Sequence, residues 1–370
     1  MSHNAAGTPP AIVCTARGVA SSIHAWCDYH LAIGFERLYL YFDDPTEHAT
    51  LNLEARYGAH RISAVAADAS LRHEWESLPG AHEWLPYVAT EVQARQTLNA
   101  LHAVRLHSAW QAQRAPGWLL HIDADELFHA GSATDAGACF EALSLEGVQA
   151  MQFANHEAVP ESEESRADQH EGASDFSRVT LFKRNPDLLP PSGAARQGVE
   201  WWFAHRGGFF QYYTNGKGAV RCTPSARPLS VHEWLPGSVS GLEHCASNMP
   251  SQHSRTRGMT KYRECDAAIL HYGVCSADML LQRWLDGEAR YLLRGRTISP
   301  RIFEEGQCLL PDKSSEKQED AILESVHTIF ASRFVLANPA EIEFQLAVGA
   351  CVRISTVKEV LECAKKTHAS

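Results

Sequence analysis

The chain has 370 residues, of which 45% are hydrophobic and 21% charged, values that are typical of a globular protein and exclude a disordered or fibrous one. Its length suffices for one large α/β domain with an appendage or for two modest domains. The formal net charge of -11 argues against nucleic acid or an anionic membrane as the main partner.

The first residues and the cysteines bear on where the protein works. Residues 1–10, which we expect to be disordered, carry neither the basic nor the apolar region of a secretory signal. No stretch approaches the roughly 20 apolar residues that span a bilayer, so we expect no transmembrane segment. The ten cysteines are scattered without a C-x-x-C pair, which indicates buried, reduced thiols. These features favour a cytoplasmic protein that acts on soluble or membrane-peripheral molecules over a secreted one. They leave the oligomeric state open.

Strand and helix patterns alternate over the first 67 residues. Apolar runs predict strands, and Ser21 or Ser22, Gly34 and Gly58 mark the start or the end of the helices between them. This order is that of a parallel sheet with right-handed crossovers, in which ligands bind at the carboxyl ends of the strands. The expected elements are a strand over 11–16, a helix over 21–34, a strand over 35–44, a helix over 46–58 and a strand over 60–67.

An apolar run after the next helix ends abruptly in acidic residues. A long helix is expected over 87–113, and the strand after it runs into Asp123, Asp125 and Glu126. Asp43 likewise follows an earlier strand, so these carboxylates are expected at one edge of the sheet. They indicate either a shared divalent cation or a solvated junction between strand and loop.

The remainder of the chain is less regular. Strand patterns recur in an aromatic and Gly-rich region over 199–234, and polar segments over 160–172 and 185–198 predict loops. Further strands are expected over 148–154 and 176–184, and helices over 277–293 and 355–366. We divide the chain into residues 11–130, residues 131–300 and a helical extension over 301–370.

Several of these residues together resemble GT-A glycosyltransferases of the family 2-like and family 92-like groups. The resemblance covers mainly residues 11–130, and one departure is Arg17-Gly18-Val19, where the family often has Lys-Asn-Glu. The matching residues are Trp26, Tyr29-His30, Gly34, Tyr41-Phe42-Asp43, Asp123-Ala124-Asp125, Glu126, Phe128, Lys217, Arg221, His232 and His271-Tyr272.

The resemblance implies an α/β fold of GT-A type. This fold has a Rossmann-like, mostly parallel sheet flanked by helices, and a smaller, irregular C-terminal acceptor region. By resemblance, residues 11–130 form the nucleotide-sugar-binding half, which ends in the Asp-x-Asp motif, and residues 131–300 form the acceptor-binding and catalytic half of the same domain. It also implies a metal-dependent hexosyl- or pentosyltransferase. The donor would be a nucleotide-diphosphate sugar, with uridine diphosphate as the nucleotide, and the acceptor a glycan or another hydroxyl compound, with inversion at the sugar carbon.

A divalent cation is part of this implied chemistry. Mn²⁺ or Mg²⁺ prefers oxygen ligands and stabilises the charge of a leaving diphosphate. By resemblance, Asp125 binds the metal directly and Asp123 contacts the metal or the donor ribose. His232 and His271 each follow a strand-like run and are candidates for a third ligand, while Glu126 is expected to support the turn.

The donor-binding and catalytic residues complete the expected site. Arg17 replaces the basic residue of the first loop beside Thr15, and Asp43 is expected at the nucleoside unless it only forms a turn. Lys217 and Arg221 either clamp phosphate oxygens or belong to a solvated strand face. An inverting enzyme also needs a carboxylate base, whereas a retaining one does not. The candidates, in order, are Glu157, Asp175 and Glu233.

Three other classes of protein compete with this interpretation. A phosphatase of the haloacid-dehalogenase type carries its Asp-x-Asp on the first strand, before a Thr, unlike this chain. A sugar-nucleotide nucleotidyltransferase opens with a Gly-rich basic loop, whereas residues 14–22 contain one Gly. The altered loop at Arg17 is consistent with a non-catalytic binding protein that has the GT-A fold. An EF-hand is excluded because its loop Gly and distal Glu are missing.

Overall fold

The structure is a computed structural model, and it describes residues 10–112, 115–163, 174–237, 245–249, 260–285 and 316–368. The described chain falls into two compact units that alternate along the sequence. The first comprises Met1–Ala154, Asn215–Ile269 and Val360–Ser370, and the second comprises Asn155–Thr214 and Leu270–Glu359. Residues 1–9, most of the expected loop over 160–172, and 286–315 lie outside the described residues.

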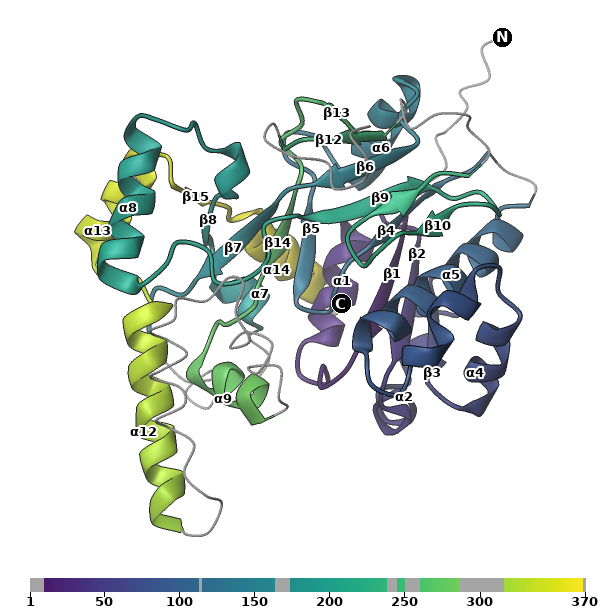
Figure 1. Cartoon of the computed structure of the whole chain (residues 1–370), viewed down its shortest axis with the longest axis horizontal. Coiled ribbons are helices and arrows are strands. Elements are labelled where there is room, and N and C mark those ends of the chain that lie inside the picture. Colours follow the sequence, from purple (N-terminus) through teal and green to yellow (C-terminus); the bar gives the residue numbers. More distant parts are fainter. Residues whose placement is uncertain are drawn as a thin grey trace. The chain divides into compact units, whose positions relative to one another are not determined.

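The first unit contains an eight-stranded, mostly parallel sheet flanked by helices (Figure 1), as the sequence predicted. The strand order is β13-β12-β6-β9-β4-β1-β2-β3, and β9 runs antiparallel to both of its neighbours. The strands of this sheet are β1 (Ala11–Ala16), β2 (Arg37–Phe42), β3 (Ile62–Ala66), β4 (Trp118–His121), β6 (Ala150–Phe153), β9 (Lys217–Arg221), β12 (Cys245–Ser247) and β13 (Thr260–Tyr262). The unit also contains the short strand β5 (Glu126–His129) and the hairpin of β10 (Arg227–Pro228) and β11 (Trp234–Leu235).

Helices pack on both faces of this sheet because its central strands are apolar on both sides. On one face Val13 and Leu119 join a core with Leu98 of α5, and on the other Trp118 packs its ring on Phe140 of α6. The helices of this unit are α1 (Ile23–Ala32), α2 (Pro45–Leu51), α3 (Leu53–Tyr57), α4 (Ala69–Glu76), α5 (Val92–Trp110) and α6 (Ala136–Leu145), with the 3₁₀ turns η1 (Ala81–Glu83) and η2 (Leu85–Tyr87).

One expected helix of the first unit is divided in two. The single helix expected over 46–58 breaks between α2 and α3 at Asn52, which has a φ of 44°. Asparagine tolerates this left-handed conformation better than most residues. The first half begins at Pro45, where the side chain of Asp44 accepts a hydrogen bond from the Thr46 N–H. The turn role considered for Asp43 therefore belongs to Asp44.

The second unit contains regular helices and its own antiparallel ladder, β15-β8-β7, where an irregular region was expected. The chain passes between the units in β14 (Ala268–His271) and α14 (Thr356–His368). The other elements of the second unit are β7 (Asn155–Val159), α7 (Asp175–Arg178), β8 (Leu181–Lys183), η4 (Pro186–Leu188), α8 (Ala194–Arg206), α9 (Ala277–Leu285), α12 (Glu316–Arg333), α13 (Pro339–Ala347) and β15 (Cys351–Arg353).

Helix α8 corrects the expectation of a loop followed by short strands over 185–213. Its buried residues Ala195, Gly198, Val199 and Trp202 recur at helical spacing and form one apolar stripe. Gly198 is required there because a Cβ atom would lie 2.4 Å from the Cβ of Ala350. Consecutive aromatic residues favour a strand in the sequence, whereas in the helix Trp202 is buried and Phe203 is exposed.

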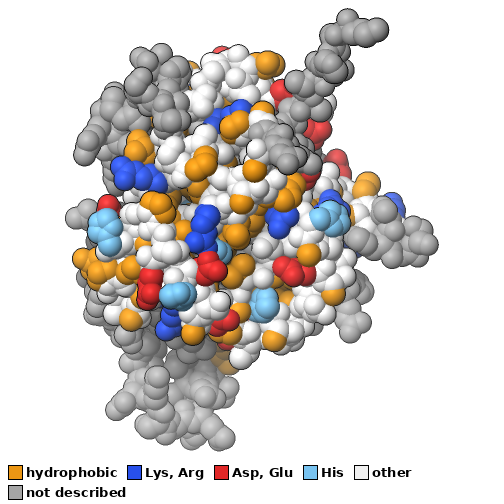
Figure 2. All heavy atoms as spheres, turned by 90° about the vertical axis from the view of Figure 1, so that its right-hand side faces the viewer, with side chains coloured by type: hydrophobic (Ala, Val, Ile, Leu, Met, Phe, Trp, Pro, Cys, Tyr) orange, Lys and Arg blue, Asp and Glu red, His pale blue; other side chains and the backbone are white. Residues whose placement is uncertain are grey.

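Two features of the surface complete the description. No helix among the described residues is both long enough and apolar enough to cross a membrane. On the face shown in Figure 2, acidic, basic and histidine side chains are interspersed among small apolar areas.

Candidate functional site

The three acidic residues lie on a tight connection between two strands. Strand β4 ends at His121, and the chain turns through Asp123 and Asp125 and enters β5 at Glu126. The Glu126 carboxylate is fully buried and accepts a hydrogen bond from the Asp123 N–H at 2.7 Å. The expectation that Glu126 supports this turn is therefore confirmed.

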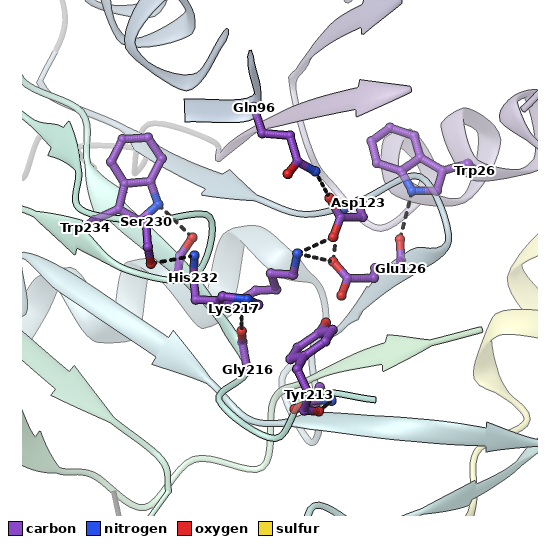
Figure 3. A network of polar contacts seen from close by, with 12 residues as sticks. Trp26, Gln96, Asp123, Glu126, Tyr213, Gly216, Lys217, Ser230, His232 and Trp234 are labelled. Atoms are coloured by element: carbon purple, nitrogen blue, oxygen red, sulfur yellow. Dashed lines mark hydrogen bonds and ion pairs between the residues drawn. The ribbon is translucent and has the colours of Figure 1, made fainter. Parts of the chain in front are cut away.

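A buried lysine joins two of these carboxylates (Figure 3). The Lys217 ammonium forms ion pairs with Asp123 and, at 3.3 Å, with Glu126. Burial alone would lower the pKa of Lys217, but the neighbouring carboxylates outweigh it and raise that pKa. Burial likewise disfavours the Asp123 carboxylate, yet Lys217 holds its pKa below the ordinary value. In this structure Lys217 therefore neutralises protein carboxylates.

One helix, α5, reaches the carboxyl ends of three parallel strands. Each contact is a side-chain hydrogen bond from the first half of the helix to a residue at a strand end. The pairs are Arg95 with Asp43 at 2.7 Å through both carboxylate oxygens, Gln96 with Asp123 at 2.7 Å, and Asn99 with Thr15 at 2.9 Å. Helix α5 thus orients side chains at the ends of β1, β2 and β4.

Sequence reasoning missed these three residues of α5. Asn99 and the following His102 are buried although they are polar, and they lie one turn apart on the helix. Polar residues on the apolar face of a predicted helix are the signal that was present, because buried polar groups need hydrogen-bond partners. The identity of those partners depended on which strands lie under the helix.

The Asp43 carboxylate is engaged inside the protein. Arg95 donates two parallel hydrogen bonds to it, a geometry that is stronger than a single charged contact, and a third Arg95 N–H donates to the Val88 carbonyl at 2.9 Å. The Asp43 side chain is 10% exposed. Its expected contact with a nucleoside would require it to share its oxygens with Arg95.

Helix α1 fastens the backbone that follows the acidic turn. The Trp26 indole N–H donates to the Glu126 carbonyl at 2.8 Å, and the Tyr29 hydroxyl donates to the Phe128 carbonyl at 2.9 Å. His30 accepts from the Phe128 N–H at 3.2 Å and its other ring nitrogen contacts the Trp26 carbonyl at 2.9 Å. These residues, which carry much of the resemblance, therefore hold β5 in place.

Replacing Tyr29 with Phe is expected to lower the free energy of unfolding by about 1–2 kcal/mol, because the buried Phe128 carbonyl loses a hydrogen bond while the ring remains. Chemical denaturation of the variant and the parent protein measures this loss. Tyr87→Phe is the matched control, since Tyr87 is 54% exposed, and it should change stability little. Equal stabilities of Tyr29→Phe and the parent would contradict a stabilising role for the hydrogen bond from Tyr29 to the Phe128 carbonyl.

Two histidines of the first unit lie near the acidic turn. The Nδ1 atom of His232 contacts the carbonyl of Gly216 at 2.7 Å (Figure 3), and Gly216 directly precedes Lys217 in the chain. His121 is fully buried, and neither of its ring nitrogens has a hydrogen-bond partner within the described part of the chain. Burial, assisted by the Lys217 ammonium, lowers the pKa of His121 to about 3, so the ring is neutral. Sequence reasoning missed His121, because it looked like part of an apolar strand.

Strand β9 separates two residues that were expected to act together. Arg221 pairs with Trp118 at the amino end of β4, whereas Lys217 lies beyond the carboxyl end of β4. Four residues of a strand span about 13 Å. Arg221 donates instead to the Ser144 hydroxyl at 2.8 Å. It is therefore removed from the candidate site, which corrects the expectation of a shared phosphate clamp.

The loop after β1 has a carboxylate partner from another helix. The N–H groups of Gly18 and Val19 donate to the two oxygens of Glu47, at 2.8 and 2.9 Å, and Arg17 is exposed. Residues 17–22 contain no acidic residue, and Glu47 of α2 supplies a carboxylate to this loop. Arg17 thus remains accessible at the carboxyl end of β1.

Three of the remaining candidates belong to the second unit. Glu157 is buried, accepts hydrogen bonds from the Gln211 N–H at 2.9 and 3.1 Å, and lies 3.7 Å from the Lys183 ammonium. Asp175 pairs with Arg178 at 2.7 Å in α7. His271 is buried, with its ring centre 4.7 Å from that of Tyr212. These contacts account for the burial of both carboxylates within their own unit.

The described residues offer carboxylates but no complete protein cage for a metal ion. No group of three or more His, Cys, Asp or Glu side chains in the described ranges has the arrangement of a metal site. Mg²⁺ is usually held by one or two carboxylates, with water and substrate phosphates as the other ligands, so Asp123 and Asp125 fit such an ion chemically. Lys217 pairs with Asp123 and Glu126, and Asp125 lies in the same turn.

Comparisons with known proteins do not assign this chain to a family. No protein-family model matches it, and no curated protein matches it. The function of this chain must therefore be inferred from the chemistry and the position of the site.

Proposed function

We propose that this protein is a GT-A-type glycosyltransferase that binds a nucleotide-diphosphate sugar at the carboxyl ends of β1, β2 and β4. The observation that carries the proposal is the acidic turn of Asp123, Asp125 and Glu126 at this edge, with one buried lysine among its carboxylates. Ligands of open α/β sheets bind at this edge. Carboxylate oxygens are the ligands that hard divalent cations prefer, so carboxylates at such a position favour a site that takes up a cation.

The charge balance supports a divalent cation as part of the proposal. The acidic turn carries the carboxylates of Asp123, Asp125 and Glu126, and a diphosphate adds further negative charge, so the two would repel each other at close range. Mn²⁺ or Mg²⁺ held by Asp123 and Asp125 would remove that repulsion. When bound, the ion would stabilise the charge that develops on the leaving diphosphate.

The protein's own residues would position this chemistry. Gln96 orients the Asp123 carboxylate, and Lys217 ties Asp123 to Glu126. Trp26 holds the backbone of Glu126 from the opposite side. Such a set of rigid contacts would keep the carboxylates in place while a donor binds.

Glu233 is our first candidate for the base that deprotonates the acceptor hydroxyl. It is half-buried beside His232 in the same unit as Asp123, and it makes no ion pair with the described residues. Glu157 and Asp175 are held by Lys183 and Arg178 in the second unit. This choice differs from the sequence-based expectation, in which Glu157 came first.

Calorimetric titration with a panel of nucleoside diphosphates, with and without Mn²⁺, tests the proposal. We expect uridine diphosphate to bind only with Mn²⁺, and Asp125→Ala to weaken that binding at least about tenfold, a loss of about 1.4 kcal/mol. Glu83→Gln, at an exposed position, is the matched control and should bind as the parent does. Absence of binding, or binding that ignores both Mn²⁺ and Asp125, would refute the donor site.

Turnover separates an enzyme from a binding protein of the same fold. A transferase should hydrolyse a uridine-diphosphate sugar slowly in the presence of Mn²⁺. With a suitable hydroxyl acceptor it should transfer the sugar and release uridine diphosphate faster. Glu233→Gln should lower this rate and leave nucleotide binding unchanged, because the base acts on the acceptor. Binding without any turnover would favour the non-catalytic alternative. Formation of a sugar nucleotide from a nucleoside triphosphate and a sugar phosphate would favour the nucleotidyltransferase.

A further inference from the structure

The loop between β1 and α1 holds a carboxylate with two consecutive backbone N–H groups. The Gly18 N–H donates to one oxygen of Glu47 at 2.8 Å, and the Val19 N–H donates to the other at 2.9 Å. Gly18 has a φ of 66°, a left-handed conformation that glycine adopts without strain. Successive N–H groups in such a turn form a concavity that binds anions. The seated carboxylate of Glu47 shows that an oxyanion fits this one.

This loop is open to solvent and lies where phosphate groups bind in related architectures. Arg17 and Gly18 are exposed, and a Cβ atom on Gly18 would meet no other atom within 4 Å. Residues 17–19 directly follow β1, whose neighbours β2 and β4 both run parallel to it. In many open α/β sheets the turn after the first strand binds a phosphate group. Arg17 adds a positive charge beside the two N–H groups.

Glu47 lies on a helix that can leave the loop at a small cost in burial. Helix α2 buries none of its residues, and segments with few buried apolar contacts open locally at low free energy. The two preceding carboxylates have other partners. Arg95 binds Asp43 through both oxygens, and the Thr46 N–H and hydroxyl donate to Asp44 at 2.8 and 2.7 Å. Departure of Glu47 would therefore expose the two loop N–H groups to an external anion.

We propose that the N–H groups of Gly18 and Val19 form a phosphate-binding site, and that Glu47 occupies this site in the absence of ligand. Two phosphate oxygens would replace the two carboxylate oxygens, and repulsion between the like charges would move α2 away from the loop. Glu47 then lowers the affinity of the site, because a ligand binds only to molecules in which the carboxylate has left. That this phosphate belongs to the donor diphosphate rests on the function proposed above.

Titration with inorganic phosphate at constant ionic strength, followed by NMR on the backbone amide signals of Gly18 and Val19, tests the proposal. We expect both signals to shift until they saturate, with a dissociation constant at least about tenfold lower in Glu47→Ala than in the parent. Glu47→Gln should lie between them, since a neutral amide binds N–H groups more weakly than a carboxylate does. Glu83→Ala, at an exposed position of η1, is the matched control and should bind as the parent does.

The parent protein supplies a second measurement that needs no variant. Saturating phosphate should also shift the amide signals of α2, because this helix leaves the loop. Unchanged signals of Gly18 and Val19 in Glu47→Ala would overturn the phosphate site. Equal dissociation constants in Glu47→Ala and the parent, or unchanged signals of α2, would overturn the role of Glu47.

Uridine diphosphate, titrated in the same way, identifies the source of the phosphate. If the phosphate belongs to the donor, this nucleotide should shift the two loop signals at lower concentrations than inorganic phosphate does. The reverse order would assign the site to free phosphate and overturn its link to the donor. All these titrations are made without Mn²⁺, so failure of the Mn²⁺-dependent site at Asp125 would leave their results unchanged.

Discussion

Replacing Lys217 with Met is expected to lower the free energy of unfolding by about 3–5 kcal/mol, because breaking a buried ion pair leaves a buried charge without its partner. Lys217 is 1% exposed and Glu126 is fully buried, so water cannot take over the role of the ammonium. The three carboxylates of the turn would also repel one another more strongly. Chemical denaturation at neutral pH and moderate salt measures the loss.

A second substitution separates charge from packing in this prediction. Glu126→Gln removes one of the carboxylates that form an ion pair with Lys217. The amide oxygen of the new side chain can still accept a hydrogen bond from the Asp123 N–H. The double variant Lys217→Met, Glu126→Gln should therefore recover part of the stability lost in Lys217→Met. Lys358→Met, at an exposed position of α14, is the matched control. A loss below about 1 kcal/mol in Lys217→Met, as for a surface ion pair, would contradict the role assigned to Lys217.

The protein is expected to lose stability steeply as the pH falls below about 6.5, the ordinary pKa of histidine. Four histidines of the first unit are buried and neutral: burial lowers the pKa of His30, His107 and His121 to about 3 and that of His102 to about 4. Above pH 6.5 neither the folded nor the unfolded chain protonates them. Below it the unfolded chain binds protons that the folded chain excludes, so unfolding becomes more favourable until the pH reaches the folded pKa values.

The expected size of this effect is large. Each such histidine lowers the free energy of unfolding by about 2 kcal/mol between pH 7 and pH 5, and the four together lower it by roughly 6–8 kcal/mol. That is comparable to the whole stability of an ordinary domain. Denaturant unfolding between pH 7.5 and pH 5 measures the slope, and above pH 5 most carboxylates remain ionised and contribute little.

Single substitutions assign the slope to particular rings. His107 contacts the Tyr39 hydroxyl and the Gln111 amide, so His107→Gln keeps a polar group there and should lower the proton uptake on unfolding by about one. His82→Gln, at an exposed position, should leave the uptake unchanged. A flat stability profile between pH 7 and pH 5 would show that these histidines are not held neutral.

The sequence predicted the parts of the fold that depend on neighbouring residues. The apolar runs at Ala11–Ala16 and Arg37–Phe42 have a helix between them that ends near Gly34. This order implies a parallel pair, because parallel strands need such a crossover connection. The acidic turn at Asp123 was likewise recognisable, since three carboxylates after a buried strand stand out in any sequence. The expected roles of Asp125, His232 and His271 remain predictions.

Residue pairs that are distant in the chain required the tertiary structure. Lys217 was expected either on a phosphate or on a solvated strand face. The antiparallel course of β9 instead brings it to Asp123, 94 residues away, and carries Arg221 to the other end of the strand. Gln96 and Arg95 were overlooked because their partners lie on strands that only the sheet order places beneath α5. Local periodicity determines which segments are strands and helices, because it depends on nearby residues. The ladder order and the helix crossings determine which side chains meet, because those depend on packing across the whole unit.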